Sequence, residues 1–138
     1  MAPIAPAYLA TLAGQIGALS AFLGGFAATY LATFLTQGHK SRAASWAIAA
    51  AAIASVGFII AVVGSTMLIS ATHPQAPSQA QAMTGVARVA MTLSFLVALL
   101  ALLVSLGASG WTRSRGIGWL TSSAAAVGIV VTLLMLVQ

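Results

Sequence analysis

Residues 44–71 read "ASWAIAAAAIASVGFIIAVVGSTMLISA", a run without a single charged side chain. A helix needs about 20 apolar residues to cross the hydrocarbon core of a bilayer, and this run is longer. Residues 8–36, 80–108 and 116–137 form three further apolar stretches. All four are too long and too rich in Ala and Leu to be strands of a barrel. The sequence therefore predicts an all-α integral membrane protein with four transmembrane helices.

The composition supports a bilayer environment. Of the 138 residues, 61% are hydrophobic and 4% are charged, with five Lys or Arg and no Asp or Glu. A soluble domain carries about 25% charged residues, so this chain cannot build a water-exposed surface. The length fits one domain, and we assign residues 1–138 to a single four-helix transmembrane unit.

Three polar breaks separate the apolar stretches. They are "QGHKSRAAS" (37–45), "THPQAPSQAQ" (72–81) and "GASGWTRSRG" (107–116). Two prolines in the second break and the glycines of the third are typical helix ends. The expected organisation is two helical hairpins, residues 7–72 and 79–138.

Charge in the breaks predicts the orientation. The first and third breaks carry Lys and Arg, whereas the middle break and both termini have none. The positive-inside rule places loops 37–45 and 107–116 in the cytoplasm, with loop 72–81 and both termini outside. Tryptophans near the basic loops fit the same boundary, because indole prefers the membrane interface. The expected interface anchors are Lys40, Arg42, Trp46, Arg113, Arg115 and Trp119.

The two basic loops resemble each other. "KSRAASW" (40–46) aligns with "RSRGIGW" (113–119) at an offset of 73. The match predicts a parallel tandem repeat of the hairpins, with a pseudo-twofold axis along the membrane normal. The same offset places Gln15 opposite Arg88, at equivalent depths in the first and third helices.

A polar stripe marks the third apolar stretch. Gln81, Thr84, Arg88 and Thr92 recur at steps of three and four residues, so they share one helix face. At 1.5 Å per residue, Arg88 is expected roughly 10 Å below the outer boundary. An arginine keeps its proton and costs around 3 kcal/mol at the centre of a membrane helix.

Four kinds of partner remain open for the Arg88 charge. Oxygens of the chain, including Gln15, and the terminal carboxylate of Gln138 would be structural partners. An acid on another polypeptide or a lipid phosphate would make the chain part of something larger. An anion in a wet cavity would make it an anion path.

Small residues recur at four-residue spacing and let a second helix approach closely. Four helices do not need so many such surfaces, so we expect self-association into a homo-oligomer; an alanine-biased composition is the alternative explanation. The expected packing positions are Ala13, Gly17, Ala21, Gly25 and Gly128.

Several functional classes are disfavoured. The chain has no Cys and no carboxylate pair, and its two histidines lie at opposite membrane boundaries. We therefore expect no enzyme activity, no metal site and no cofactor. Four of the five cations sit in two short loops, which is not the pattern of a nucleic-acid surface.

Two functional hypotheses remain. The first is an oligomeric pore subunit for anions or small neutral solutes, because Arg or Lys rings suit anion pores. Arg88 would line the path with Gln15, Thr84 and Thr92, and Phe95 and Leu99 would form a hydrophobic gate. The second is a non-catalytic accessory subunit of a larger membrane complex, in which a partner supplies the acid for Arg88.

Overall fold

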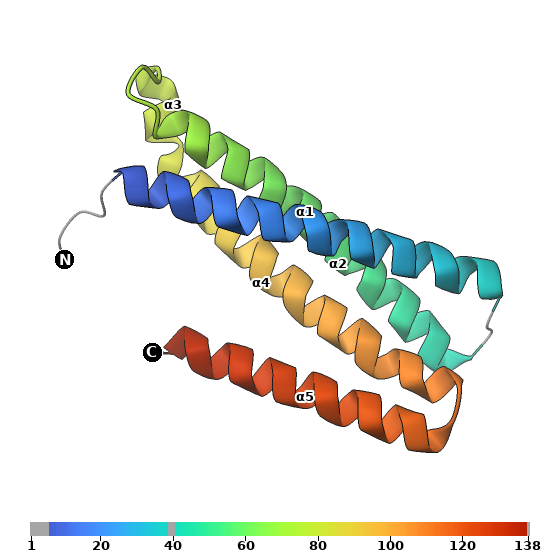
Figure 1. The fold of residues 1–138 in the computed structure, drawn as a ribbon. Coiled ribbons are helices and arrows are strands. Elements are labelled where there is room, and N and C mark those ends of the chain that lie inside the picture. The colour runs from blue at the N-terminus through green and yellow to red at the C-terminus, as the bar shows by residue number, and fades with distance from the viewer. Residues whose placement is uncertain (1–5, 39–40, 138) are drawn as a thin grey trace.

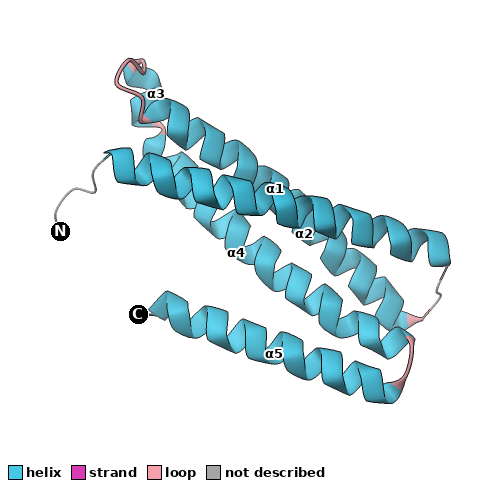
Figure 2. Cartoon of the chain, viewed as in Figure 1, coloured by secondary structure: helices cyan, strands magenta, loops and turns pink. Residues whose placement is uncertain are grey.

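The computed structural model describes residues 6–38 and 41–137. Four long helices are present: α1 (Pro6–Gln37), α2 (Arg42–Ala71), α4 (Thr84–Ser109) and α5 (Arg115–Val137) (Figure 1). The short helix α3 (Ser78–Ala82) and the 3-10 helix η1 (Gly110–Thr112) lie in the connections (Figure 2). All four long helices are long and apolar enough to cross a membrane. The predicted all-helical membrane fold is confirmed at this level.

The connection between α2 and α4 differs from the expectation. The third apolar stretch was predicted to begin at residue 80, but α4 begins at Thr84 and Gln81 belongs to α3. Gln81 Nε2 donates to the Ala76 carbonyl at 3.2 Å, and the Thr84 hydroxyl donates to the Gln81 carbonyl at 2.7 Å. These polar groups are satisfied within the connection, and Gln81 is not part of the polar face of α4.

Serine caps begin the helices that follow both basic connections. The Ser41 hydroxyl accepts from the Ala44 N–H at 3.1 Å, and the Ser114 hydroxyl accepts from the Ile117 N–H at 3.2 Å. Such caps satisfy an N–H group that the first turn of a helix leaves without a partner. The two serines are separated by the predicted repeat offset, so part of the loop match has a local structural cause.

The helices are arranged in an open array in the order α1, α2, α4, α5. Helix α2 packs against α1 and α4, and α5 packs against α4 and η1. No Cα atom of α1 lies within 8 Å of a Cα atom of α5 among the described residues. Figure 1 shows α4 and α5 meeting near η1 and diverging towards the C-terminus.

Glycines bring α2 and α4 together. A Cβ added at Gly57 would lie 2.8 Å from the Ala98 Cβ, and one at Gly64 would lie 3.1 Å from the Met91 Cβ. Close backbone approach replaces the hydrophobic driving force that is missing between helices in lipid. The fully buried Phe58 fills this interface. Its ring meets Phe95 edge-on, with centroids 6.1 Å apart.

A polar bond also joins α2 and α4 near their basic connections. The hydroxyl of the buried Ser105 donates to the Ala47 carbonyl at 2.8 Å. Interhelical bonds of this kind contribute about 0.6 kcal/mol on average in a membrane protein. The bond therefore adds less stability than packing does, but it fixes the register of the two helices.

The residues expected to pack are divided between covered and uncovered faces. Gly17 lies against Ser65 of α2, Ala13 is buried, and Gly128 packs on Leu103 of α4. Ala21 and Gly25 are exposed. Ala13, Gly17 and Gly128 therefore pack within the single chain. Ala21 and Gly25 lie on a face of α1 that no described helix covers.

The tandem repeat and the N-out/C-out orientation stay predictions. A twofold exchange of the hairpins would map the α2–α4 interface onto an α5–α1 interface. Because α1 and α5 do not approach each other, the packing gives no support for such an axis. Lys40 and Gln138 lie outside the described residues.

We expect Gly57→Val to destabilise the protein by about 1–3 kcal/mol, because the added side chain must displace Ala98 or the Ser94 backbone. Thermal unfolding in detergent measures the change. Gly85→Val is the matched control, since a Cβ at Gly85 meets no atom within 4 Å. Equal losses in the two variants would contradict the close α2–α4 contact.

Candidate functional site

Arg88 lies one turn after the start of α4, and its side chain is exposed. The helix from Arg88 to Trp111 spans about 34 Å at 1.5 Å per residue. The hydrocarbon core is about 30 Å thick, and an average helix tilt shortens the projected distance by only about 2 Å. If Trp111 lies at one interface, Arg88 is expected close to the opposite interface. Counting from Gln81 gave a depth of roughly 10 Å, and both depths stay predictions.

We name the two ends of the helix array after residues that lie there. The basic end contains Arg42, Arg113 and Arg115, and the proline end contains Pro74, Pro77 and the start of α4. Trp46 and Trp119 lie near the basic end with their side chains 70% exposed. The Trp111 indole donates to the Ser122 hydroxyl at 2.8 Å. This arrangement of cations and indoles is typical of a membrane interface.

The Arg88 guanidinium has no hydrogen-bond or ionic partner among the described residues. The chain contains no Asp or Glu, and the Gln138 carboxylate lies outside the described residues. Gln15 is exposed on α1 and makes no bond to Arg88. The described side chains therefore leave this charge to be compensated by water, lipid or another molecule.

The threonines of the polar stripe donate their hydroxyl protons to nearby backbone carbonyls. The Thr92 hydroxyl donates to the Arg88 carbonyl at 2.9 Å, and Thr84 donates to Gln81 in the preceding connection. Both oxygens keep lone pairs that can accept, but an anion requires donors. On this face, Arg88 is the side chain with donors to offer.

The expected gate residues do not line an opening within one chain. Phe95 packs against the core cluster that contains Phe58, Ala98 and Leu102. Leu99 is half-buried. A gate built from these residues would require a passage formed between several copies.

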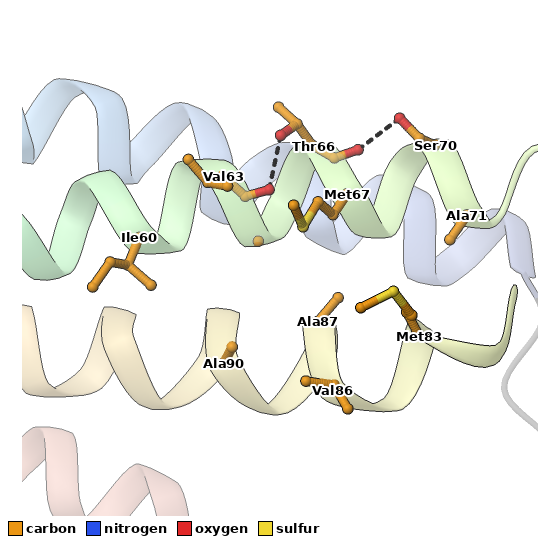
Figure 3. Close-up of a pocket in the computed structure, with 11 residues that line it drawn as sticks. Ile60, Val63, Thr66, Met67, Ser70, Ala71, Met83, Val86, Ala87 and Ala90 are labelled. Carbon is orange, nitrogen blue, oxygen red and sulfur yellow. Dashed lines mark hydrogen bonds between the residues drawn. The ribbon is translucent and has the colours of Figure 1, made fainter. Parts of the chain in front are cut away.

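A groove between α2 and α4 lies near the proline end (Figure 3). Its volume is about 500 Å³. Figure 3 shows Ala87 and Ala90 on the side of α4 that faces α2. The Thr66 and Ser70 hydroxyls in its wall donate to carbonyls of their own helix, at 2.8 and 2.9 Å. At 3.6 residues per turn, Arg88 is on the far side of α4, so this apolar groove is separate from the polar stripe.

His73 forms no site with other described residues. His73 lies exposed in the connection at the proline end, where its Nδ1 accepts from the Gln75 N–H at 3.3 Å. His39 lies outside the described residues. Within the described chain, no three potential metal ligands come together.

Sequence reasoning missed the full extent of one exposed face of α1. Small residues follow each other there at alternating steps of four and three. We call this face the α1 seam; it comprises Gly14, Ala18, Ala21, Gly25, Ala28 and Ala32. All are exposed except the partly covered Gly14. The alternating spacing was the signal available in the sequence, whereas a constant step of four drifts around the helix.

We expect a cysteine at Arg88→Cys to react with a membrane-impermeant maleimide, because position 88 reaches the interface. The chain has no native cysteine, so labelling reports one site. Val97→Cys is the control: its side chain is 53% exposed but lies deep within the span, so it should stay unlabelled. Labelling from outside sealed cells would also place the proline end outside. Protection of position 88 equal to that of position 97 would contradict the interfacial location.

No family model, no curated protein and no solved structure matches this chain. Its function must therefore be argued from its own residues.

Proposed function

We propose that the chain is a non-catalytic subunit of a membrane assembly, which it enters by lateral association through the α1 seam. The observation that carries the proposal is the exposure of this face along most of a membrane-spanning helix. Lipid-facing helix surfaces gain little from small side chains, whereas helix–helix contacts depend on them.

The geometry of the seam suits a second helix. Steps of four and three give a period of 3.5 residues, which keeps the small side chains along one side of a left-handed crossing. Additional atoms at Gly14 or Gly25 would meet nothing within 4 Å in this chain, so a neighbouring backbone has room to approach. The α2-facing residues of α1 repeat every seven residues on a different side, at Ala13, Ser20, Ala27 and Phe34.

Arg88, on helix α4, supports the same proposal. Its exposed guanidinium lacks a partner among the described residues and lies near an interface, where a carboxylate on a neighbouring polypeptide is accessible. A charge-assisted, bidentate pair at that depth would fix the orientation of the partner as well as attract it. The seam would supply contact area, and Arg88 would supply selectivity.

Crosslinking tests the seam directly. We expect a photo-reactive benzoylphenylalanine in place of Ala21 to give a discrete protein adduct in native membranes. The same residue in place of Ile59, which is exposed on α2, should give lipid adducts. The mass of the adduct distinguishes a second copy from a different subunit. Association through the seam would be rejected if the probe at Ala21 gave no protein adduct. It would also be rejected if the probe at Ile59 gave protein adducts as strongly as the probe at Ala21.

An oligomeric anion pore is the second candidate. The exposed face of α4 carries Arg88 and Thr92, and the chain lacks any acidic side chain that would repel anions. One chain does not enclose a lumen among its described residues, because α1 and α5 stay apart. Such a pore would therefore form between copies, with several Arg88 side chains around one axis.

Anion flux into liposomes separates the two candidates. If the pore hypothesis holds, wild-type protein conducts anions, and Arg88→Gln lowers the flux or its anion selectivity, because one positive charge per subunit is removed from the path. Arg115→Gln is the control, since it removes the same charge at the opposite end. A folded, oligomeric wild-type protein without flux would reject the pore and leave the assembly subunit.

A further inference from the structure

We propose that the basic end holds a binding site for the phosphodiester headgroup of an anionic phospholipid. The site is a cavity lined by residues from the end of α1, the end of α4, η1 and the start of α5, with Arg113 as its cation. This inference is independent of the assembly role, because it concerns a different set of residues and a different ligand.

The cavity has a volume of about 470 Å³. Its wall is more polar than that of the groove between α2 and α4. The polar residues that line it are Tyr30, Gln37, Ser109, Thr112, Arg113 and Thr121. A space of this size accommodates a glycerophosphate group, and its lining brings side chains from four helical elements together.

Arg113 supplies the charge for an anion. Its backbone N–H donates to the Gly110 carbonyl, which ties the residue to η1. Its guanidinium has no partner among the described residues, and the sequence has no acid to neutralise it. Arg42 and Arg115 lie at the same end, so the field there is positive without compensation. A planar guanidinium can bind two phosphate oxygens at once.

Further donors of the cavity wall are unused. The Tyr30 hydroxyl is shielded from solvent and makes no hydrogen bond in the described chain. The neighbouring hydroxyls of Ser105 and Ser109 donate to the Ala47 and Leu106 carbonyls, so they have no proton left to donate to the Tyr30 oxygen. The Gln37 amide also makes no bond to a described residue. Gln37 is exposed, whereas the Tyr30 hydroxyl is a buried polar group without a hydrogen bond, which is uncommon in native proteins and calls for a partner.

The surroundings favour a lipid over a soluble phosphate. Trp111 and Trp119, with ring centroids 6.0 Å apart, mark the interface beside the cavity. Anionic headgroups gather at such basic pockets between membrane helices. The positive-inside prediction would place this end in the cytoplasmic leaflet, where anionic lipids are common.

An apolar path leads from the cavity into the bilayer. Phe26 lies one turn before Tyr30 and stacks on its ring, with centroids 6.3 Å apart. On α5, the exposed Leu120 lies one turn after the cavity residue Ile117. Since α1 and α5 do not approach each other, acyl chains can lie against both faces while the headgroup stays in the cavity.

The test compares lipid binding by two arginine variants. Native mass spectrometry of the detergent-purified protein counts adducts with phosphatidylglycerol, and phosphatidylcholine is the zwitterionic reference. We expect Arg113→Gln to weaken phosphatidylglycerol binding about fivefold, because one cation leaves the site. Arg115→Gln removes the same charge two residues away but outside the cavity wall, and it should change binding less than twofold.

Two further measurements separate the remaining explanations. Tyr30→Phe should also weaken binding of phosphatidylglycerol if the phenol donates to the phosphate, and thermal unfolding verifies that each variant is folded. Inorganic phosphate should not compete at millimolar concentration if the acyl chains contribute. Equal losses in Arg113→Gln and Arg115→Gln would reject the site in favour of general charge attraction. Competition by inorganic phosphate would reject a lipid as the ligand.

Discussion

The close contact between α2 and α4 is the constraint on which the rest of the structure depends. Membrane helices gain no hydrophobic energy by leaving lipid, so their association relies on tight packing. Gly57 and Gly64 remove the side chains that would hold the two backbones apart. Helix α1 then packs on the other side of α2, and α5 attaches to α4 near η1. Both outer helices therefore keep large faces uncovered, and those faces are where partners and lipids can bind.

The four spans were predictable because apolar length alone decides whether a helix can cross a bilayer. The arrangement of those spans was not predictable, since small residues occur on covered and uncovered faces alike. Gly17 lies against Ser65, whereas Gly25, two turns later, has no neighbour. The loop match was a real pattern, but Ser41 and Ser114 show that helix capping produces part of it.

The sequence singles out Arg88 as a candidate functional residue, but it does not give the geometry around it. Arg88 stood out because the sequence has no acid to pair with it. Its expected depth depended on where α4 begins, and the helix interruption at Met83 places that start at Thr84 instead of residue 80. Gln15 and Arg88 shared a depth in the alignment but not a contact in space. The cavity at the basic end brings together Tyr30, Arg113 and Thr121, whose proximity no local pattern reveals.

The one-sided attachment of α5 bears on how the protein is made. Helices emerge from the ribosome in order, and α1, α2 and α4 complete their mutual contacts without any residue of α5. The last helix docks along its first half, where Gly107 meets Ala125 and Leu103 meets Gly128. The packing of α1, α2 and α4 is therefore complete before α5 is needed, and the contacts that α5 adds are with α4 and η1 alone among the described elements.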